Sequence, residues 1–400
     1  MLTVMKFGGS SLSTVERVAN VASIIASGVN DDDRVVAVVS ARGKTTDELT
    51  KVRDSITAVS VPRESDVLLS TGEQVSMSLL AMKLNEMGHD AVSLCGWQAG
   101  IRTNDRYGSA SITEIDTSRV LRELEAGRIV IVAGFQGVSP NQDITTLGRG
   151  GSDTTAIALA AALHADSCHI YTDVSGVFSA NPNVAIDAIK HREISYDEMI
   201  EMSTLGAKVL HNRSVIMAKN ADVSFEVRSS LTNDEGTKVH RLAPEKTVSG
   251  VVCDDHISMV TVSGIDSGAS TCRLFELLAD NGIPVDVIIR SQQMYNGKGM
   301  VSFSVSDTVC IRVVDMLNEM KDELEHDMLM VESGLAKLSA VGSGLADSCT
   351  VASIMLSELN KIDIHPRYIT TGEIRISVII PSSKADMAQI ILNKRFFGEE

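Results

Sequence analysis

Short aliphatic runs alternate with helical stretches from the N-terminus to about Ala243, and this alternation constrains the fold more than any other feature. The runs predict short buried strands at Val4–Phe7, Val35–Ser40, Ala91–Leu94, Ile129–Ala133 and His169–Val174. The stretches between them predict helices at Val15–Ser27, Glu73–Met87, Thr117–Ala126 and Thr154–Leu163. Regular alternation of this kind is typical of an α/β sandwich with a mostly parallel or mixed sheet.

The chain beyond Ala243 is similar to itself at a separation of about 78 residues, which indicates a duplicated unit. The matching segments are Val260–Gly264 with Leu338–Gly342, Thr271–Asn281 with Thr350–Asn360, and Ile283–Asp286 with Ile362–His365. Each copy continues with a further strand, at Gly299–Val305 or Glu373–Ile380, and a final helix. The repeat predicts two βαββα units, the layout of small ligand-sensing domains, with chance similarity of two α+β segments as the alternative.

Composition limits the partners of this chain. Its formal charge of −16, from 52 acidic and 36 basic residues, repels nucleic acid and anionic membranes. A small anionic ligand is still compatible with this charge where a few Lys, Arg and backbone N–H groups are concentrated. No apolar run approaches the ~20 residues of a membrane span, and the N-terminus shows no secretion signal. We therefore expect a cytoplasmic protein without membrane or nucleic-acid partners.

Length and cysteine spacing add two further expectations. A chain of 400 residues is too long for one ordinary hydrophobic core, so it predicts two or three domains. The six cysteines are widely separated and form no C-x-x-C pair. This spacing predicts buried free thiols in a reducing compartment, as opposed to disulfides or a zinc site.

Three glycine-rich segments each follow a predicted strand, and they are the candidate binding loops. The first, Lys6–Ser11, places two glycines where backbone N–H groups and a lysine can approach a phosphate. The second, Gly148–Thr155, contains three glycines and Arg149, whose planar guanidinium suits a carboxylate or phosphate. The third, Tyr171–Phe178, ends a strand in polar groups, where open α/β sheets bind ligands.

Each of these segments also has a purely structural interpretation. The first and third could be plain turns, and Ser152 or Asp153 could cap the helix that follows the second. Capping does not require three glycines and an arginine, however, so we predict an anion site in the second segment. The Walker sequence G-x-x-x-x-G-K-[ST] occurs nowhere in the chain.

Together with three further segments, these loops resemble the signature set of the aspartokinases, in the same order. The six segments are Lys6–Ser11, Ser40–Gly43, Thr71–Glu73, Thr146–Thr155, Tyr171–Phe178 and Gly206–His211. The resemblance covers essentially the whole chain. It implies a three-layer α/β/α amino-acid kinase domain over 1–243, followed by two ferredoxin-like (βαββαβ) ACT domains over 258–335 and 336–400. A strand near 247–255 would complete an ACT sheet.

The resemblance also implies an activity and a set of site residues. The reaction is transfer of the ATP γ-phosphoryl group to the β-carboxylate of L-aspartate, the first step of lysine, threonine and methionine biosynthesis. The implied catalytic residues are Lys6, Asp153 and Lys208. The implied nucleotide-binding residues are Lys6, Phe7, Gly8, Gly9, Thr172, Asp173, Phe178 and Lys208. The implied aspartate-binding residues are Ser40, Thr46, Glu73, Arg149 and Ser152.

Within this implied site, Arg149 would bind the α-carboxylate of aspartate and Glu73 its α-ammonium. The β-carboxylate is already ionised at pH 7, so a direct in-line transfer needs no general base. Catalysis would depend on positioning and on neutralisation of charge by Lys6, Lys208 and glycine-loop N–H groups. Asp153 would organise Lys6 or the substrate ammonium, with helix capping as its rival role. We expect Mg²⁺ to be carried mainly by ATP and water, so no protein metal ligand is named.

Two parts of the chain depart from the family pattern. Asn181-Pro182-Asn183 stands where an acidic residue, proline and arginine are usual, which removes an arginine that resembles a phosphate contact. Phe178 stands where a tyrosine is common. The effector loops of both ACT units also lack the usual Pro-Gly. The candidate effector-binding residues that remain are Asp266, Asp286, Arg290 and His365.

The ACT resemblance implies feedback by lysine, threonine or both, and a homo-oligomer formed through the ACT domains. Some relatives also make a shorter regulatory subunit from an internal start. Two other functions stay open: a non-catalytic amino-acid-sensing regulatory homologue, and a kinase for another amino-acid carboxylate. Retention of Lys6, Arg149, Asp153 and Lys208 argues against the first, and the pairing of Glu73 with Arg149 argues against the second.

Overall fold

The computed structural model describes residues 1–28, 33–59, 61–207, 209–241, 247–265, 268–295, 298–324, 326–345 and 349–398, with only the backbone of 292–295 and 298. Two compact units make up the chain. Unit 1 consists of Met1–Phe178 and Lys190–Pro244, and unit 2 consists of Ser179–Ile189 and Glu245–Glu400. The expected domain boundary near Ala243 lies outside the described residues.

Unit 1 is built on an eight-stranded sheet in the order β10-β12-β11-β9-β1-β2-β6-β3. The strands are β1 (Leu2–Phe7), β2 (Arg34–Val39), β3 (Ala91–Leu94), β6 (Ile129–Ala133), β9 (Ser167–Thr172), β10 (Glu193–Ser195), β11 (Phe225–Ser229) and β12 (Thr237–His240). Every pairing is parallel except that of β11 with β12. All five strands predicted from aliphatic runs are present in this sheet, so the expected α/β architecture is confirmed.

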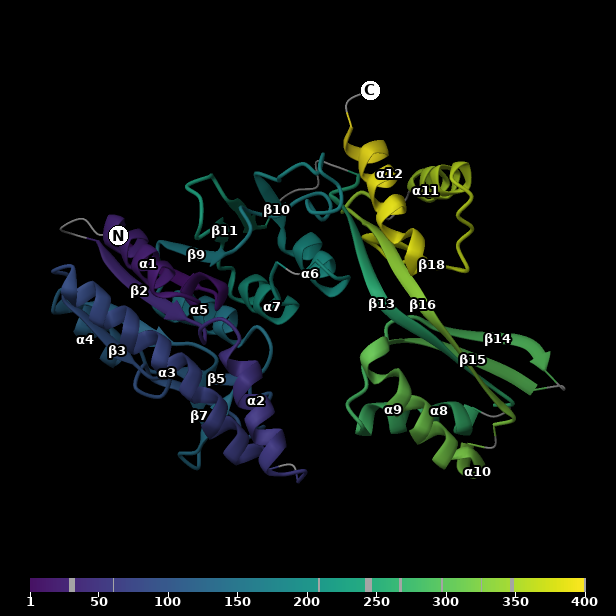
Figure 1. Cartoon of the computed structure of the whole chain (residues 1–400), viewed down its shortest axis with the longest axis horizontal. Helices are drawn as coiled ribbons and strands as arrows, with labels where there is room; N and C mark the ends of the chain where they lie inside the picture. The colour runs from purple at the N-terminus through teal and green to yellow at the C-terminus, as the bar shows by residue number, and fades with distance from the viewer. Residues whose placement is uncertain are drawn as a thin grey trace. The chain divides into compact units, whose positions relative to one another are not determined.

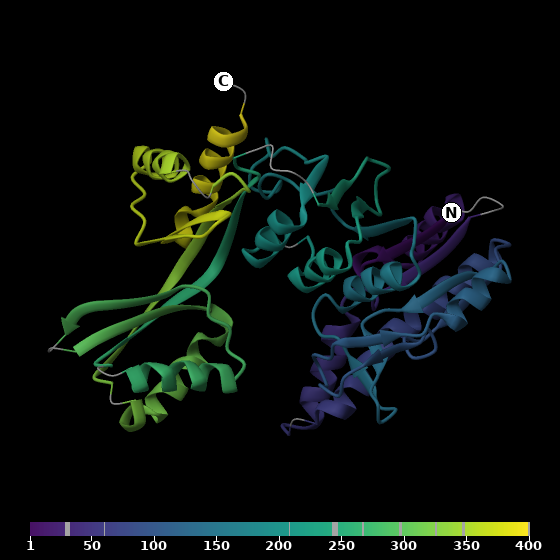
Figure 2. The same ribbon diagram turned by 180° about the vertical axis from the view of Figure 1, so that it is seen from behind.

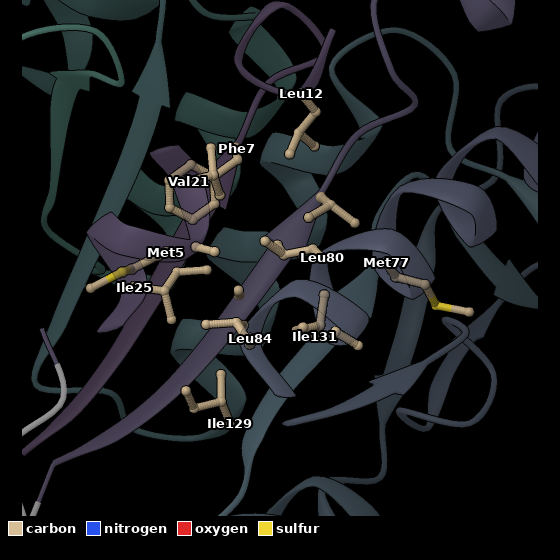
Figure 3. Packing of buried hydrophobic residues seen from close by; sticks show 14 of the residues in the cluster. Met5, Phe7, Leu12, Val21, Ile25, Met77, Leu80, Leu84, Ile129 and Ile131 are labelled. Carbon is tan, nitrogen blue, oxygen red and sulfur yellow. The ribbon is translucent and has the colours of Figure 1, made fainter. Parts of the chain in front are cut away.

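Helices cover both faces of this sheet, which gives the expected three layers (Figure 1). On one face α1 (Val15–Ser27) and α3 (Pro62–Glu86) bury side chains such as Val21, Ile25, Leu80 and Leu84 against Phe7 (Figure 3). On the other face α5 (Gly151–Ala162) packs against β1, β2 and β9. Residues 151–160 of α5 are all buried, as its apolar sequence predicts.

The carboxyl ends of four adjacent strands meet at one edge of the sheet. Backbone hydrogen bonds continue the pairing past the strand ends, with N–H to O distances of 3.2 Å from Gly8 to Tyr171, 3.1 Å from Ser40 to Phe7 and 3.0 Å from Gly134 to Val39. Loops at the carboxyl edge of an open α/β sheet are where ligands bind. The glycine-rich segments therefore lie at the edge that positions a site.

Around this edge lie elements that the sequence analysis did not anticipate. They are η1 (Ser10–Leu12), α2 (Thr45–Ile56), α6 (Tyr196–Thr204), α7 (Asn212–Ala221) and a small sheet of β5 (Ile112–Ile115), β4 (Ile101–Thr103), β7 (Gln136–Val138) and β8 (Ile144–Thr146). The predicted helix over Thr117–Ala126 is α4 (Ser118–Glu125). β8 leads into the second glycine-rich segment, so the small sheet supports one wall of the site.

Two predicted helix starts were wrong. Helix α3 begins at Pro62, eleven residues before the predicted Glu73, because Gly72 does not break it. A Cβ on Gly72 would lie 2.7 Å from the Cβ of Ala41, so this glycine permits close packing against the loop after β2. Helix α5 begins at Gly151, so Ser152 and Asp153 lie in its first turn and do not cap it.

Unit 2 contains a six-stranded antiparallel sheet in the order β14-β15-β13-β16-β18-β17. The strands are β13 (Gly250–Ser263), β14 (Ile288–Tyr295), β15 (Lys298–Ser306), β16 (Met328–Val341), β17 (Tyr368–Thr371) and β18 (Arg375–Pro381). The helices are α8 (Gly268–Asp280), α9 (Asp307–Glu319), α10 (Lys321–Leu324), α11 (Cys349–Lys361) and α12 (Ala385–Phe397). Figure 2 shows the two long strands, β13 and β16, running through both halves of the unit.

The internal repeat is present as two cores, and the two long strands serve both. The half of β13 at Ile257–Ser263 pairs with β15, whereas its half at Gly250–Asp254 pairs with Lys337–Val341 of β16. One core packs under α8 and α9, and the other under α11 and α12. The predicted extra strand near 247–255 thus adds to the sheet of the second repeat.

Segment 179–189 lies in unit 2 although it interrupts unit 1 in sequence. The Val251 N–H donates to the Ser179 carbonyl at 2.6 Å, and the Ser179 hydroxyl donates to Asn393 Oδ1 at 2.7 Å. Asn393 Nδ2 donates in turn to Asp187 Oδ1 at 3.3 Å. Residues 179–189 are therefore held by β13 and α12.

Three details of the sequence analysis need correction. Ile283–Asp286 and Ile362–His365 are loops, and the strands after them begin at Ile288 and Tyr368. Prolines at 284 and 366 explain the late starts, because proline cannot donate to a strand ladder. All six cysteines are free as predicted, but Cys272 and Cys349 are exposed and Cys253 is half-buried. Among the described residues, no helix has the length and apolar character needed to cross a membrane.

Candidate functional site

A cavity of about 860 Å³ opens at the carboxyl edge of the unit 1 sheet; we call it the strand-end cavity. Its walls come from the loops after β1 and β2, from α2, from one face of α3, and from the segment between β8 and α5. The residues lining it are Lys6, Gly9, Ser40, Ala41, Gly43, Thr46, Asp47, Thr50, Arg53, Pro62, Ser65, Asp66, Leu69, Glu73, Tyr107, Gly108, Phe135, Thr146, Gly148, Arg149, Gly150, Gly151, Ser152 and Asp153. Two of the three glycine-rich segments therefore contribute to one site.

A buried ion pair joins these two segments. Lys6 Nζ lies 2.6 Å from Asp153 Oδ1, and the side chains are 9% and 12% exposed. Lys6 lies in β1, one residue before the strand ends, and Asp153 is in the first turn of α5. The N-terminus of a helix stabilises a carboxylate through the helix dipole. The contact matches the organising role expected for Asp153, while the N-cap position belongs to Gly150 without a side-chain hydrogen bond.

Glu73 offers the cavity a buried carboxylate oxygen. Its Oε1 accepts a hydrogen bond from the Ala41 N–H at 2.9 Å, and its Oε2 has no hydrogen-bond partner among the described residues. Burial raises the pKa of this carboxyl from 4.5 to about 8. A cationic group brought next to Oε2 would restore the charged form, so this position suits an ammonium ligand.

Arg149 offers the opposite charge at the mouth of the cavity. Its side chain is exposed and makes no ion pair or hydrogen bond within the part of the chain that the structure describes. The glycines on either side have φ of +76° at Gly148 and +69° at Gly150. A Cβ on Gly150 would also lie 2.3 Å from the Cβ of His211. Glycine is therefore required to present this arginine, whose guanidinium remains available for a bidentate anion.

The first glycine-rich segment is shaped by two close approaches. The Gly8 N–H donates to the Tyr171 carbonyl at 3.2 Å, and a Cβ on Gly9 would lie 2.6 Å from the Ala41 carbonyl oxygen. Phe7 lies in the core, where its ring stacks on Tyr171 at 4.8 Å. Its ring is therefore not open to a nucleotide, and only its backbone remains for the expected role.

The remaining expected site residues divide into three groups. Ser40, Thr46 and Ser152 line the strand-end cavity with Glu73 and Arg149. Thr172, Asp173 and Phe178 do not line it; Thr172 ends β9, the strand beside β1 in the sheet, and the other two follow that strand. The Thr172 hydroxyl instead accepts a hydrogen bond from the Val174 N–H at 3.0 Å. Lys208 lies outside the described residues.

Three of the four candidate effector residues of unit 2 lie in the described part of the chain. The Asp286 carboxylate contacts the Lys337 ammonium and lies 3.7 Å from Arg375 Nη2, so two cations already occupy it. Arg290 is exposed on β14, and His365 lies 3.2 Å from Asp363. Asp266 lies outside the described residues.

The sequence analysis missed several residues of the strand-end cavity, including Asp66, Gly108 and Tyr107. Asp66 belongs to the part of α3 that the predicted helix start at Glu73 left out. Had the helix been extended, the spacing of Asp66, Ser70 and Glu73 would have placed all three on one face. Gly108 and Tyr107 belong to a loop without a signature motif.

Comparisons with known proteins identify the family of this chain. Residues 1–229 match the model of the amino acid kinase family, and residues 338–396 match that of an ACT domain. Aspartokinase 2 of Bacillus subtilis is 47% identical over 98% of this chain and 96% of its own length. The structure of E. coli aspartokinase III in complex with aspartate and ADP (R-state) aligns with a TM-score of 0.82 over 100% of both chains at 26% identity.

A second E. coli aspartokinase III structure, in complex with lysine and aspartate (T-state), aligns with a TM-score of 0.79 over 99% of both chains at 26% identity. The family match covers more than half of the chain, and the relatives extend over both units. The chain therefore belongs to the amino acid kinase family and, within that family, to the aspartokinases.

Proposed function

We propose that the strand-end cavity is where L-aspartate and ATP meet in the aspartate kinase reaction of this chain (EC 2.7.2.4), which yields 4-phospho-L-aspartate and ADP. One observation carries the proposal: an unpartnered buried Glu73 oxygen and an unpaired Arg149 guanidinium line the same cavity as the Lys6–Asp153 pair. An α-amino acid with a second carboxylate needs an anion for its ammonium and cations for its two carboxylates.

Two charged side chains orient the acceptor aspartate, one at its α-carboxylate and one at its α-ammonium. Arg149 binds the α-carboxylate through two parallel N–H···O bonds, and Glu73 binds the α-ammonium. Ser40, Thr46 and Ser152 supply hydroxyl groups along the wall between them. The β-carboxylate then extends toward Lys6 at the end of β1.

The nucleotide is held on the side of the first glycine-rich segment. The N–H groups of Gly9 and Ser10 donate to no backbone acceptor among the described residues, whereas that of Gly8 is taken by Tyr171. Together with Lys6 they suit phosphate oxygens.

Lys208 would add a second cation, and Thr172, Asp173 and Phe178 would contact the nucleoside end. Mg²⁺ would be bound by the phosphates and water and would neutralise the charge of the phosphates. In the described ranges, no group of three or more His, Cys, Asp or Glu is arranged to hold a metal ion.

The chemical step requires positioning more than proton transfer. An ionised β-carboxylate oxygen forms a bond to the γ-phosphorus, and the bond from that phosphorus to the β,γ-bridging oxygen breaks to release ADP. No proton is abstracted, because the nucleophile is charged at pH 7. Lys6 neutralises charge that would otherwise repel the two anions, and Asp153 holds the Lys6 ammonium in place.

Regulation, assembly and location are proposed from the ACT repeats and the composition. Lysine, threonine or both bind unit 2 and inhibit, and the chain forms a homo-oligomer through its ACT sheet, with a shorter regulatory subunit possible as a partner. The enzyme acts in the cytoplasm. Since two cations occupy Asp286, the effector ammonium is bound elsewhere in unit 2 or displaces one of them.

A hydroxamate assay with Mg-ATP tests the proposal. Aspartate should yield hydroxamate, whereas glutamate should yield little, and Arg149→Ala should raise the KM for aspartate far more than that for ATP. The assay is repeated with lysine, threonine and methionine to identify the effector. Turnover of glutamate in preference to aspartate would favour the kinase for another carboxylate, and no turnover with any acceptor would favour a non-catalytic sensor.

A further inference from the structure

Asp66 is a buried carboxylate beside the strand-end cavity, outside all six signature segments. It lies in the second turn of α3 and is 1% exposed. Its two oxygens accept from the Gly108 N–H at 3.0 and 2.9 Å, and they also accept from the Thr146 N–H at 2.8 Å and the Thr146 hydroxyl at 2.8 Å. No cation pairs with it among the described residues, so neutral donors alone satisfy it.

This arrangement ties together segments that are distant in sequence. Gly108 lies 42 residues and Thr146 lies 80 residues from Asp66. A buried carboxylate without a cation is costly unless hydrogen bonds satisfy it, so its energetic benefit depends on the geometry of these donors. The side chain therefore fixes the loop at Gly108 and the end of β8 relative to α3.

Both anchored segments support the loop that carries Arg149. Thr146 precedes Arg149 by three residues, and the carbonyl oxygen of Gly108 would lie 2.9 Å from a Cβ on Gly148. The Ala110 N–H donates to the Thr146 carbonyl at 2.9 Å. Any shift of the segment around Gly108 or Thr146 would therefore move the Arg149 loop.

The same helix carries the group expected to bind the other end of the acceptor. Glu73 follows Asp66 by seven residues, which places both on one face of α3, two turns apart. Both residues line the strand-end cavity. Helix α3 thus holds Glu73 directly and the Arg149 loop through Asp66.

We propose that Asp66 is a positioning residue that sets the separation of Arg149 from Glu73 and thereby the affinity for the acceptor amino acid. The inference rests on the proposed roles of Arg149 and Glu73 at the two ends of aspartate. Asp66 does not contact the reacting atoms. Its effect is expected on the KM for aspartate, and much less on the KM for ATP or on kcat.

Asp66→Asn in the full chain is the central test. The amide has one acceptor oxygen, and its NH₂ group would face a backbone N–H donor, so at least one of the anchoring bonds is lost. We expect the KM for aspartate to rise tenfold or more, with the KM for ATP within about twofold and kcat within about threefold. Calorimetric titration with aspartate should show the same loss of affinity.

Glu123→Gln is the matched control. Glu123 is also a buried carboxylate of unit 1, 4% exposed, but it bonds to Arg119 and Arg128 and does not line the cavity. Its substitution should leave the KM for aspartate unchanged even where the midpoint of thermal unfolding falls. This separates a loss of positioning from a general loss of stability.

Thr146→Val keeps the backbone donor and removes only the hydroxyl, so it tests the proposal even if Asp66→Asn does not fold. Thr146→Val should raise the KM for aspartate by a smaller factor than Asp66→Asn does, and Thr146→Ser should restore the native KM. The double variant Asp66→Asn/Thr146→Val should raise the KM by less than the product of the two single effects. An unchanged KM for aspartate in folded Asp66→Asn, or in Thr146→Val where Asp66→Asn is unfolded, overturns the inference. If Arg149→Ala also leaves that KM unchanged, the proposed acceptor site itself fails.

Discussion

At the scale of the residue, the Lys6–Asp153 ion pair allows a direct test of the proposed mechanism. The two side chains are 2.6 Å apart and nearly buried, so removing either leaves an uncompensated charge. In the proposed reaction, the lysine also neutralises the negative charge that gathers during phosphoryl transfer. Its contribution to the reaction can therefore be separated from its contribution to stability by using two variants.

Lys6→Ala should lower kcat by 10²-fold or more, on the order of 3 kcal/mol, as for other groups that stabilise developing charge. Steady-state kinetics at saturating aspartate and ATP measures this loss. Asp153→Asn keeps Lys6 and serves as the comparison, with a smaller loss of kcat expected. Near-native turnover in Lys6→Ala would remove this lysine from the mechanism.

The proposed role of Glu73 predicts that the binding of aspartate depends on pH. Its carboxyl has a pKa of about 8, so it is protonated in the free enzyme at neutral pH, and only its charged form attracts an ammonium. The KM for aspartate should therefore fall by up to about tenfold per pH unit as pH rises toward 8. Glu73→Gln should raise this KM and abolish its pH dependence; a parallel pH profile in both proteins would contradict the assignment.

The same shift predicts how stability varies with pH. Folding raises the pKa of Glu73 from 4.5 to about 8. Its contribution to the free energy of unfolding is therefore fully present below pH 4.5 and is lost as the pH rises to 8. Glu73→Gln lacks this loss. Urea unfolding should therefore show the variant gaining stability relative to the native chain between pH 5 and pH 8, and the opposite trend would mean that Glu73 is ionised in the folded state.

At the scale of the element, some features follow from sequence and others do not. Helix α1 was predicted with its observed limits, and the structure shows that the Thr14 side chain caps its start. Helix α3 was predicted to begin at Glu73 but continues through Gly72, which permits a close contact with Ala41. Asp66 was missed because the predicted helix left out the first turns of α3. Its contacts with Gly108 and Thr146 are not visible in local patterns, because those residues are distant in sequence.

The candidate site shows the same division. Lys6 and Arg149 were predicted because each stands in a glycine-rich loop that leaves a local signature, whereas Glu73 was predicted only through the resemblance to the aspartokinases. Phe7 was assigned to the nucleotide, but the alternation of β1 turns its ring into the core. The positions of Thr172, Asp173 and Phe178 outside the cavity depend on how β9 ends, which only the folded chain shows.

The glycine before α5 gives a prediction about the loop of Arg149. Gly150→Ala should destabilise unit 1 by more than Gly127→Ala, although both glycines have positive φ, of +69° and +79°. Nothing lies within 4 Å of a Cβ on Gly127, so that change should cost only about 1–2 kcal/mol of backbone strain. At Gly150 the Cβ also meets His211, so the KM for aspartate should rise as well. Equal urea midpoints for the two variants would show that the loop relaxes freely.

At the scale of the whole molecule, the two ACT repeats should lose stability together. β13 and β16 each contribute to both cores, so a cavity in one core weakens strands that the other uses. Leu278→Ala and Met355→Ala, one in each core, should each cost about 2–5 kcal/mol. Hydrogen exchange should show reduced protection in both repeats, whereas the exposed Ile311→Ala should change little. Loss confined to the substituted repeat would contradict this coupling.

The path of residues 179–189 has a consequence for how the molecule can be divided. The polypeptide passes from one unit to the other at 178–179, at 189–190 and again after residue 241, so three covalent connections join the units instead of a single linker. A protease cutting between 241 and 247 would nick the chain without releasing two pieces, because the upstream fragment keeps Ser179 docked on Val251 and Asn393. A separately translated ACT polypeptide would lack residues 179–189. Its β13 and α12 would therefore be free to bind residues 179–189 of a full-length copy.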